Sequence, residues 1–269
     1  MPDDQFATDV EPLGTTFATI TNRTLISPST DYPAEPQPVA VPRIPDSEPL
    51  EREQERMVQR AYLRATAEEP LAVNPGQHVW YQFAKRALDV SIAIAALVVF
   101  APIMLVVALA IRLDSPGPAI FKQQRVGKNG RLFCMYKFRS MTVNAGVLLN
   151  GVHKSESDSR ITKVGQFIRK TSLDELPQLV NVLLGQMSLV GPRPELPEIV
   201  LQRYEPWQYR RLDVPQGITG WWQVTGRGKK LLWKHTADDL YYVDRASFWF
   251  DLKLLFMTVR AVLGRNGAF

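Results

Sequence analysis

The longest apolar run in the chain extends from Val90 to Ile111 and contains no charged residue. A run of this length can cross a bilayer, which takes roughly 20 apolar residues. Basic residues lie on both sides of it, with Lys85 and Arg86 before it and Arg112 after it. Because cytoplasmic flanks are the ones that collect Lys and Arg, both ends of the run favour the same side of a membrane.

Pro102 lies near the middle of this run and offers a way to keep both ends on one side. Proline lacks an amide hydrogen and clashes with the preceding turn, so it bends or breaks a helix. The pattern therefore allows two structures. One is a re-entrant helix that enters and leaves by the same face, and the other is an ordinary kinked transmembrane helix.

Two shorter patterns predict a hairpin and a final helix. Residues Ala119–Val126 and Arg131–Met141 flank the turn Gly127-Lys-Asn-Gly130, as two strands joined in a hairpin do. The apolar stretch Phe248–Leu263 keeps three charged residues, Asp251, Lys253 and Arg260. It suits either a helix at the membrane interface or a buried core helix.

The first 80 residues have a different character. Residues 1–50 hold 9 of the 20 prolines and show no periodicity, so we predict a disordered acidic tail. Residues 51–69 are rich in Glu, Arg, Gln and Ala, which favours a helix. We predict that residues 51–80 form a linker that contains this helix. A solvated linker helix is favoured over a helix that binds a partner.

Charge and cysteine content narrow the class of protein. Acidic residues prevail before residue 80 and basic residues after it, so the positive net charge of the chain comes from the second part alone. A basic body suits an anionic membrane surface, nucleic acid or phosphorylated substrates. Cys134 is the single cysteine, which excludes an internal disulfide, and His78, His153 and His235 have no zinc-ligand spacing.

Asp174 and Glu175 form an adjacent carboxylate pair at the start of a helix predicted from about Ser172 or Asp174 to Leu184. Ser172 with Glu175 three residues later fits a capping box, and Pro177 suits the first turn. The same position places a carboxylate in the positive field of a helix N-terminus, which favours an ionised nucleophile or metal ligand. Capping and catalysis are therefore compatible.

Basic residues on or beside turns complete a candidate phosphate site. An aspartate that attacks a phosphoryl group must overcome repulsion between anions, so the site needs Mg²⁺ and basic side chains. Turn-borne guanidinium groups suit this task because they can project into a cleft. The candidates are Lys137, Arg139, Arg160, Arg169, Lys170, Arg193 and Arg227.

Seven motifs follow one another in a characteristic order. They are Lys85-Arg86…Asp89, the proline-broken run, Gly117-Pro118…Phe121…Gln124-Arg125-Val-Gly127, Lys137-Phe-Arg-Ser-Met141, Ser172-Leu-Asp-Glu-Leu-Pro-Gln178, Met187-Ser-Leu-Val-Gly-Pro-Arg-Pro194, and Gly217-Ile-Thr-Gly220…Gln223-Val-Thr-Gly-Arg227. This order resembles the bacterial sugar transferase family, the monotopic polyprenyl-phosphate phosphoglycosyl transferases, over roughly residues 81–265. The chain departs from the family at Ala101, where a serine is common, and its first 80 residues match no part of it.

The resemblance implies transfer of a sugar-1-phosphate from a UDP-sugar to undecaprenyl phosphate, with release of UMP. This reaction begins the synthesis of an exopolysaccharide or another surface glycan. By the same resemblance, Asp174 attacks the β-phosphate and forms a phosphosugar-enzyme intermediate, and Glu175 assists by metal or proton handling. Undecaprenyl phosphate then attacks that intermediate.

The resemblance also assigns the remaining site residues. Mg²⁺ is expected at Asp174. The phosphate- and substrate-binding residues are Lys137, Arg139, Arg169, Arg193 and Arg227. The membrane helix includes Lys85, Arg86, Asp89 and Pro102, and the family pattern favours the re-entrant alternative.

The expected fold is mainly α with small β-hairpin elements, in a monotopic membrane protein with a proline-broken re-entrant helix and interfacial amphipathic helices. After the tail and linker, residues 81–115 form the re-entrant helix, and residues 116–269 form a cytosolic catalytic domain with a C-terminal interfacial helix. The expected location is the bacterial inner membrane, with the catalytic domain on its cytosolic face. A homodimer is one option for the oligomeric state.

Two other functions fit parts of the sequence. A non-catalytic scaffold of polysaccharide assembly could use the basic body on anionic lipid, but it has no use for the acid pair together with the turn-borne arginines. A membrane-tethered nucleic-acid-binding protein could stack bases on Trp221, Trp222 and Trp233. The resemblance favours the enzyme, with no nucleic-acid partner.

Overall fold

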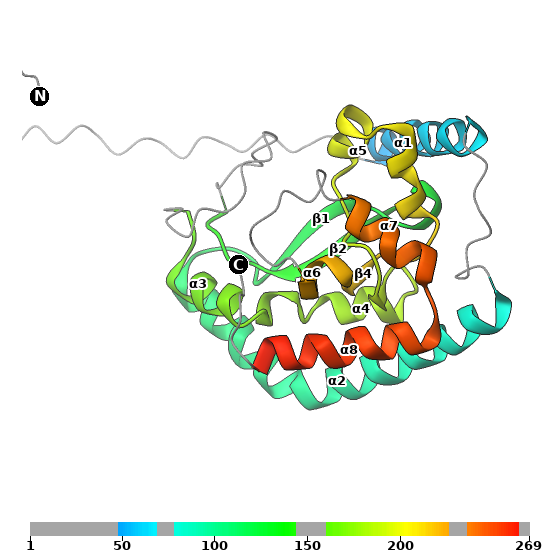
Figure 1. Cartoon of the computed structure of the whole chain (residues 1–269). Helices are drawn as coiled ribbons and strands as arrows, with labels where there is room; N and C mark the ends of the chain where they lie inside the picture. Colours follow the sequence, from blue (N-terminus) through cyan, green and yellow to red (C-terminus); the bar gives the residue numbers. More distant parts are fainter. Residues whose placement is uncertain (1–47, 69–77, 144–159, 226–235, 264–269) are drawn as a thin grey trace, which may run out of the picture. The chain divides into compact units, whose positions relative to one another are not determined.

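The computed structural model describes residues 48–68, 78–143, 160–225 and 236–263 (Figure 1). The tail expected over residues 1–50 lies almost wholly outside the described residues. The elements in chain order are α1 (Glu48–Glu68), α2 (Val79–Asp114), β1 (Ile120–Val126), η2 (Lys128–Gly130), β2 (Leu132–Phe138), α3 (Lys163–Lys170), η3 (Leu173–Glu175), α4 (Gln178–Leu183), β3 (Ser188–Val190), α5 (Pro197–Arg203), η4 (Pro206–Leu212), β4 (Gly217–Thr219), α6 (Trp221–Thr225), α7 (Thr236–Arg245) and α8 (Phe248–Leu263). The prediction of a mainly helical protein with a small hairpin is confirmed.

The longest element, α2, continues as one helix through Pro102. Figure 1 shows α2 as a bent helix, so the run that contains Pro102 is bent but remains one helix. Within the described ranges, α2 is the one helix that is long and apolar enough to cross a membrane. Only 11% of its most apolar 18-residue stretch is buried, whereas the core helix of a water-soluble protein is mostly buried.

Both ends of α2 pack on the same body of the protein. Near its start, Tyr81 and Ala93 belong to the main hydrophobic core. Near its end, Val107 and Ile111 are buried in a second cluster. The stretch between these ends is largely uncovered, and Val98 there is 70% exposed.

The predicted hairpin is confirmed. Strands β1 and β2 pair antiparallel, with Ile120 opposite Phe138 and Val126 opposite Leu132. A second sheet, which the sequence pattern did not indicate, joins β3 and β4 in parallel, with Ser188 opposite Gly217. Each of these strands has three residues, too few for an alternating pattern to be recognised.

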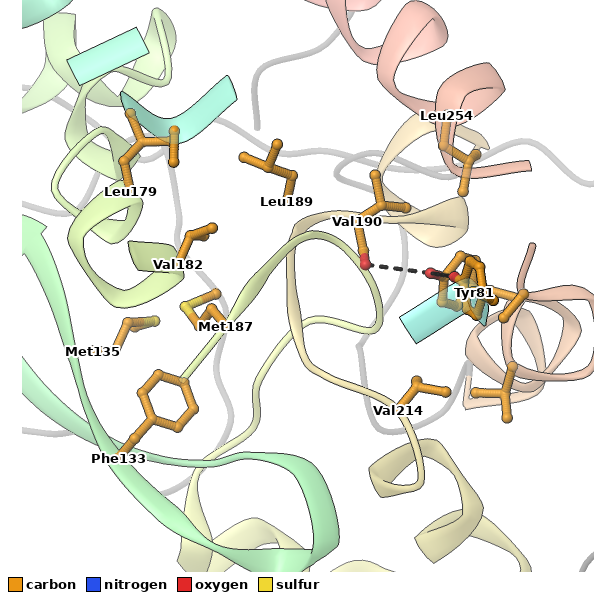
Figure 2. Packing of buried hydrophobic residues seen from close by; sticks show 14 residues of the cluster. Tyr81, Phe133, Met135, Leu179, Val182, Met187, Leu189, Val190, Val214 and Leu254 are labelled. Carbon is orange, nitrogen blue, oxygen red and sulfur yellow. Dashed lines mark hydrogen bonds between the residues drawn. The ribbon is translucent and has the colours of Figure 1, made fainter. Parts of the chain in front are cut away.

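The main core lies where β2, α4 and β3 meet the two long apolar helices, α2 and α8 (Figure 2). Its buried members include Phe133 and Met135 from β2, Val182 from α4 and Leu254 from α8. The core therefore fixes the hairpin and α2 to one another.

Helix α1 confirms the helix expected over residues 51–69 but differs from a solvated linker. Val58 is fully buried and Ala65 is 6% exposed, in a cluster shared with β1, α5 and η4. The Tyr62 hydroxyl also donates to Oδ1 of Asp213 at 2.9 Å. Ala61, Tyr62 and Ala65 join Val58 in this cluster, which docks one face of the helix, whereas Met57 and Leu63 are exposed.

Helix α8, for which the sequence left a core helix and an interfacial helix open, has one buried face and one exposed face. Asp251 and Leu254 are buried on one face, at 1% and 0% exposure, so this face belongs to the core. Trp249 and Phe256 on the other side are 77% and 70% exposed. Large exposed apolar side chains of this kind mark a surface that binds a partner or a membrane.

Candidate active site

The acid pair lies in a tight turn between two helices. After α3, Ser172 adopts a left-handed conformation with φ of 58°, which costs a residue other than glycine about 1 kcal/mol. Asp174 and Glu175 follow in η3, before α4 begins at Gln178. The Ser172 side chain makes no capping hydrogen bond, so the predicted capping box was wrong. The predicted helix is also divided into η3 and α4.

Glu175 is the meeting point of two basic side chains. Its Oε1 atom accepts hydrogen bonds from Nζ of Lys137 at 3.0 Å and from Nη2 of Arg193 at 2.7 Å. The three side chains are 14–25% exposed, so they are partly withdrawn from water but still reachable. Both donors are cations, and this arrangement is that of an ionised carboxylate.

Asp174 lies close enough to the same two cations to influence their pKa values. Burial lowers the pKa of Lys137, and the negative charge of Glu175 partly opposes this effect. The charge of Glu175 is the main reason why the pKa of Arg193 is raised. The charge of Asp174 raises the pKa of both cations as well, which places its carboxylate within electrostatic reach of them.

A buried asparagine sets the acid pair against the hairpin. Asn181 of α4 is fully buried and donates from Nδ2 to the Cys134 carbonyl at 2.7 Å. Its Oδ1 accepts from the amide of Tyr136 at 3.0 Å. These bonds fasten α4 to β2, and they therefore fix the turn that carries Glu175 relative to Lys137 on the same strand.

The other expected phosphate-binding residues are Arg139, Arg169 and Arg227. Arg139 lies at the end of α2, where its guanidinium donates to the carbonyls of Ile111, Ser115 and Pro116. It thus serves the local fold, because the last carbonyls of a helix need donors. Arg169 is buried in the last turn of α3. Arg227 lies outside the described residues.

The charged residues expected to flank the membrane run instead fasten α2 to the body. Lys85 is 5% exposed and binds Oδ2 of Asp251 at 2.8 Å. Arg86 donates to the carbonyls at the end of α4, and Asp89 accepts from the amide of Leu189 at 3.0 Å. Lys85, Arg86 and Asp89 lie inside α2, which begins at Val79, and they have internal partners.

Two arginines near the site, the half-buried Arg125 and the fully buried Arg211, were missed as functional candidates. Arg125 donates to the Pro194 carbonyl at 3.2 Å, and Arg211 donates to the Arg193 carbonyl at 2.7 Å. Burial lowers the pKa of Arg125 to about 10, so it remains protonated near neutral pH. Arg125 belongs to a quoted motif and could have been suspected, whereas nothing in the sequence around Arg211 distinguishes it.

The donor set fits Mg²⁺ if a substrate supplies further oxygen ligands. In the part of the chain that the structure describes, no cluster of three or more His, Cys, Asp or Glu side chains could form a complete metal cage. Mg²⁺ is often held by one or two carboxylates together with substrate phosphates, and Asp174 offers such a carboxylate. Glu175 already serves two cations.

Comparison with known proteins gives one family. Residues 80–265 match the family model described as bacterial sugar transferase. The chain is 45% identical over 196 residues to galactosyl transferase CpsE of Streptococcus agalactiae, which covers 69% of this chain and 43% of that protein. It is 44% identical over 185 residues to the UDP-glucose:undecaprenyl-phosphate glucose-1-phosphate transferase of Escherichia coli. This match covers 65% of this chain and 39% of that protein. It is 45% identical over 186 residues to the uncharacterized sugar transferase EpsL of Bacillus subtilis. This match covers 68% of this chain and 89% of that protein.

Proposed function

Since this chain belongs to the bacterial sugar transferase family, we propose that it transfers a sugar-1-phosphate from a UDP-sugar to undecaprenyl phosphate and releases UMP. The chain spans 43% and 39% of the lengths of CpsE and the Escherichia coli relative, so their activities enter here as a proposal. The single observation that carries it is the convergence of Lys137 and Arg193 on Glu175, directly beside Asp174. A scaffold has no need of this arrangement.

The proposed first step makes one phosphorus–oxygen bond and breaks another. A carboxylate oxygen of Asp174 attacks the β-phosphorus of the UDP-sugar, and the oxygen that bridges the two phosphorus atoms leaves with UMP. In the second step a phosphate oxygen of undecaprenyl phosphate attacks the same phosphorus. The Asp174 carboxylate is regenerated, and the sugar becomes linked to the lipid through a diphosphate.

The charges at the site support a role for Mg²⁺. Asp174 and Glu175 carry two negative charges, and Lys137 and Arg193 carry two positive charges, so this group has no net charge to offer an anionic diphosphate. When bound at Asp174, Mg²⁺ would supply positive charge that lessens the repulsion between nucleophile and phosphates. Glu175 keeps the two cations together, and we propose that they turn toward the phosphates when the substrate binds.

The arrangement of α2 supports a monotopic membrane protein. Both of its ends are packed on one body, whereas its middle is exposed and apolar. A body that holds both ends would keep them on one side of the bilayer, and this supports a re-entrant helix over a spanning one. The exposed Trp249 and Phe256 of α8 would lie at the interface, and the catalytic domain would face the cytosol.

Membranes that contain the protein should release UMP from one or more UDP-sugars when undecaprenyl phosphate and Mg²⁺ are present. The panel includes UDP-glucose and UDP-galactose, because the names of the relatives differ in the sugar. Removal of Mg²⁺ with EDTA should abolish release, and adding Mg²⁺ back should restore it. If no UDP-sugar yields UMP above membranes that lack the protein, the proposed function is wrong.

The re-entrant arrangement predicts that both ends of α2 are accessible from the cytosolic side. In a Cys134→Ser background, His78→Cys and Arg131→Cys each provide one thiol at an exposed position before or after α2. An impermeant maleimide should label both in inside-out vesicles and neither in right-side-out vesicles. Labelling of one position in each kind of vesicle would instead establish a spanning helix.

A further inference from the structure

The segment from Val190 to Glu195, which carries Arg193 between β3 and α5, is held through its main chain by several elements. Lys85 Nζ donates to the Val190 carbonyl at 2.9 Å, and the Gly217 amide donates to the Pro192 carbonyl at 2.8 Å. The Arg193 carbonyl accepts from Arg211 Nη2 at 2.7 Å. The Pro194 carbonyl accepts from Arg125 Nη1 at 3.2 Å, and the Glu195 carbonyl accepts from the Val126 amide at 2.9 Å. The donors come from α2, β4, η4 and β1, so neighbouring elements hold the segment along its length.

Close packing further restricts this segment. Gly191 is buried, and a Cβ atom there would overlap with the carbonyl oxygen of Pro215 and press on the amide of Gly217. Pro192 and Pro194 have fixed φ angles on either side of Arg193. The side chain of Arg193, which reaches Glu175, therefore projects from a main chain with little freedom to move.

Arg211 is the most deeply buried of the cations that hold the segment. Its residue exposure is 0%, and its charge is balanced by Oδ2 of Asp239 at 2.6 Å, which is 1% exposed. Its other terminal nitrogen donates to the hydroxyl of Tyr204. Arg211 thus joins η4 and α7 to the one carbonyl that belongs to Arg193 itself.

A buried ion pair of this kind is poorly explained by stability alone. Desolvating a guanidinium and a carboxylate costs several kcal/mol, and apolar residues of similar volume often stabilise a fold as well or better. The adjacent pair Arg210–Asp244 joins the same two elements at 2.7 Å, with side chains that are 24% and 46% exposed. An exposed pair can link η4 to α7, but only the buried one also reaches the Arg193 carbonyl.

We propose that Arg211 is a positioning residue for the transfer reaction, acting through the main chain of Arg193 without touching the substrate. By holding the Arg193 carbonyl, it fixes the point from which the Arg193 guanidinium extends toward Glu175 and the substrate phosphates. This inference rests on the proposed function. Small displacements of a group that contacts the reacting phosphates can reduce the rate by about 10²-fold, so the anchor of Arg193 matters for turnover.

The test is a double-mutant cycle with Arg193→Ala and Arg211→Lys. Lysine keeps a positive charge beside Asp239 but lacks the forked head that serves Tyr204 and the Arg193 carbonyl together. Alone, Arg211→Lys should lower kcat for UMP release about tenfold and leave KM for the UDP-sugar within about twofold. In the Arg193→Ala background, Arg211→Lys should cause no further loss of kcat, because Arg211 acts on the reaction through the side chain that Arg193→Ala removes. The matched control Arg210→Lys should keep wild-type kcat.

Equal losses in both backgrounds would show a general structural role and overturn the proposal. Hydrogen exchange supplies a readout that needs no turnover: in Arg211→Lys, the amides of the peptide covering residues 190–195 should exchange faster than in wild type and in Arg210→Lys. Unchanged hydrogen exchange in that peptide also overturns the proposal.

If Arg211→Lys does not fold, the double variant Arg211→Gln/Asp239→Asn removes both charges and enters the same measurements. A wild-type protein that releases no UMP contradicts the proposed function, and the exchange result still decides whether Arg211 holds the segment.

Discussion

Asp174→Asn is expected to lower UMP release by at least about 10³-fold, because an amide of the same shape cannot attack phosphorus as a carboxylate does. It also removes the expected ligand of Mg²⁺. Membrane association should persist, since Asp174 lies in η3 and neither α2 nor the exposed face of α8 depends on it. The measurements are UMP release from membranes and the share of protein in the membrane pellet.

A covalent intermediate gives this prediction a second readout. With a UDP-sugar labelled in the sugar but without undecaprenyl phosphate, the wild-type protein should acquire label in proportion to the UMP released, and Asp174→Asn should acquire none. The matched control is Asp244→Asn, which changes an exposed carboxylate on α7 that pairs with Arg210. Turnover close to wild type in Asp174→Asn would exclude Asp174 as the nucleophile.

Glu175→Gln is expected to reduce kcat by about 10²-fold, because it removes the charge that holds two cations in place. The variant should also change the pH dependence. Burial and the charge of Arg193 lower the pKa of Lys137, and the charge of Glu175 opposes them. Without that charge the pKa of Lys137 falls further, so Lys137 loses its proton, and the rate declines, at a lower alkaline pH than in wild type.

The pH profile of kcat between pH 7 and pH 10 tests the second prediction. Glu205→Gln is a suitable control because Glu205 is exposed and lies outside the site. If kcat of Glu175→Gln declines at the same alkaline pH as kcat of wild type, the Glu175–Lys137 pair does not govern the rate. An unchanged kcat would remove Glu175 from the mechanism altogether.

The elements that could be predicted are those whose pattern is local. The hairpin over residues 119–141 follows from two strand-like stretches around a turn with two glycines, and its pairing is confirmed. The helix at Phe248–Leu263 and the long apolar helix were equally readable. The parallel pair β3 and β4 was not, because its three-residue strands come from segments far apart in the chain.

The geometry of the candidate site could be predicted only in part. Asp174, Glu175, Lys137 and Arg193 were all named from the sequence, and the structure brings Lys137 and Arg193 onto Glu175. The capping box was wrong because Ser172 has a left-handed conformation that a general capping rule does not anticipate. Sequence alone also cannot tell a solvent-exposed arginine from one that holds a carbonyl, which is why Arg139 was placed at the site and Arg211 was overlooked.

The attachment of α2 at both ends has a consequence for the choice of lipid. A helix that spans a bilayer must match its hydrophobic thickness by tilting or by deforming the lipid. Lys85 and Asp89 hold one end of α2, and Arg139 holds the other, so the two ends cannot separate to follow a thicker membrane. In a re-entrant arrangement, activity should therefore be insensitive to acyl-chain length and instead respond to how tightly lipids pack in the single leaflet that the bend of α2 enters.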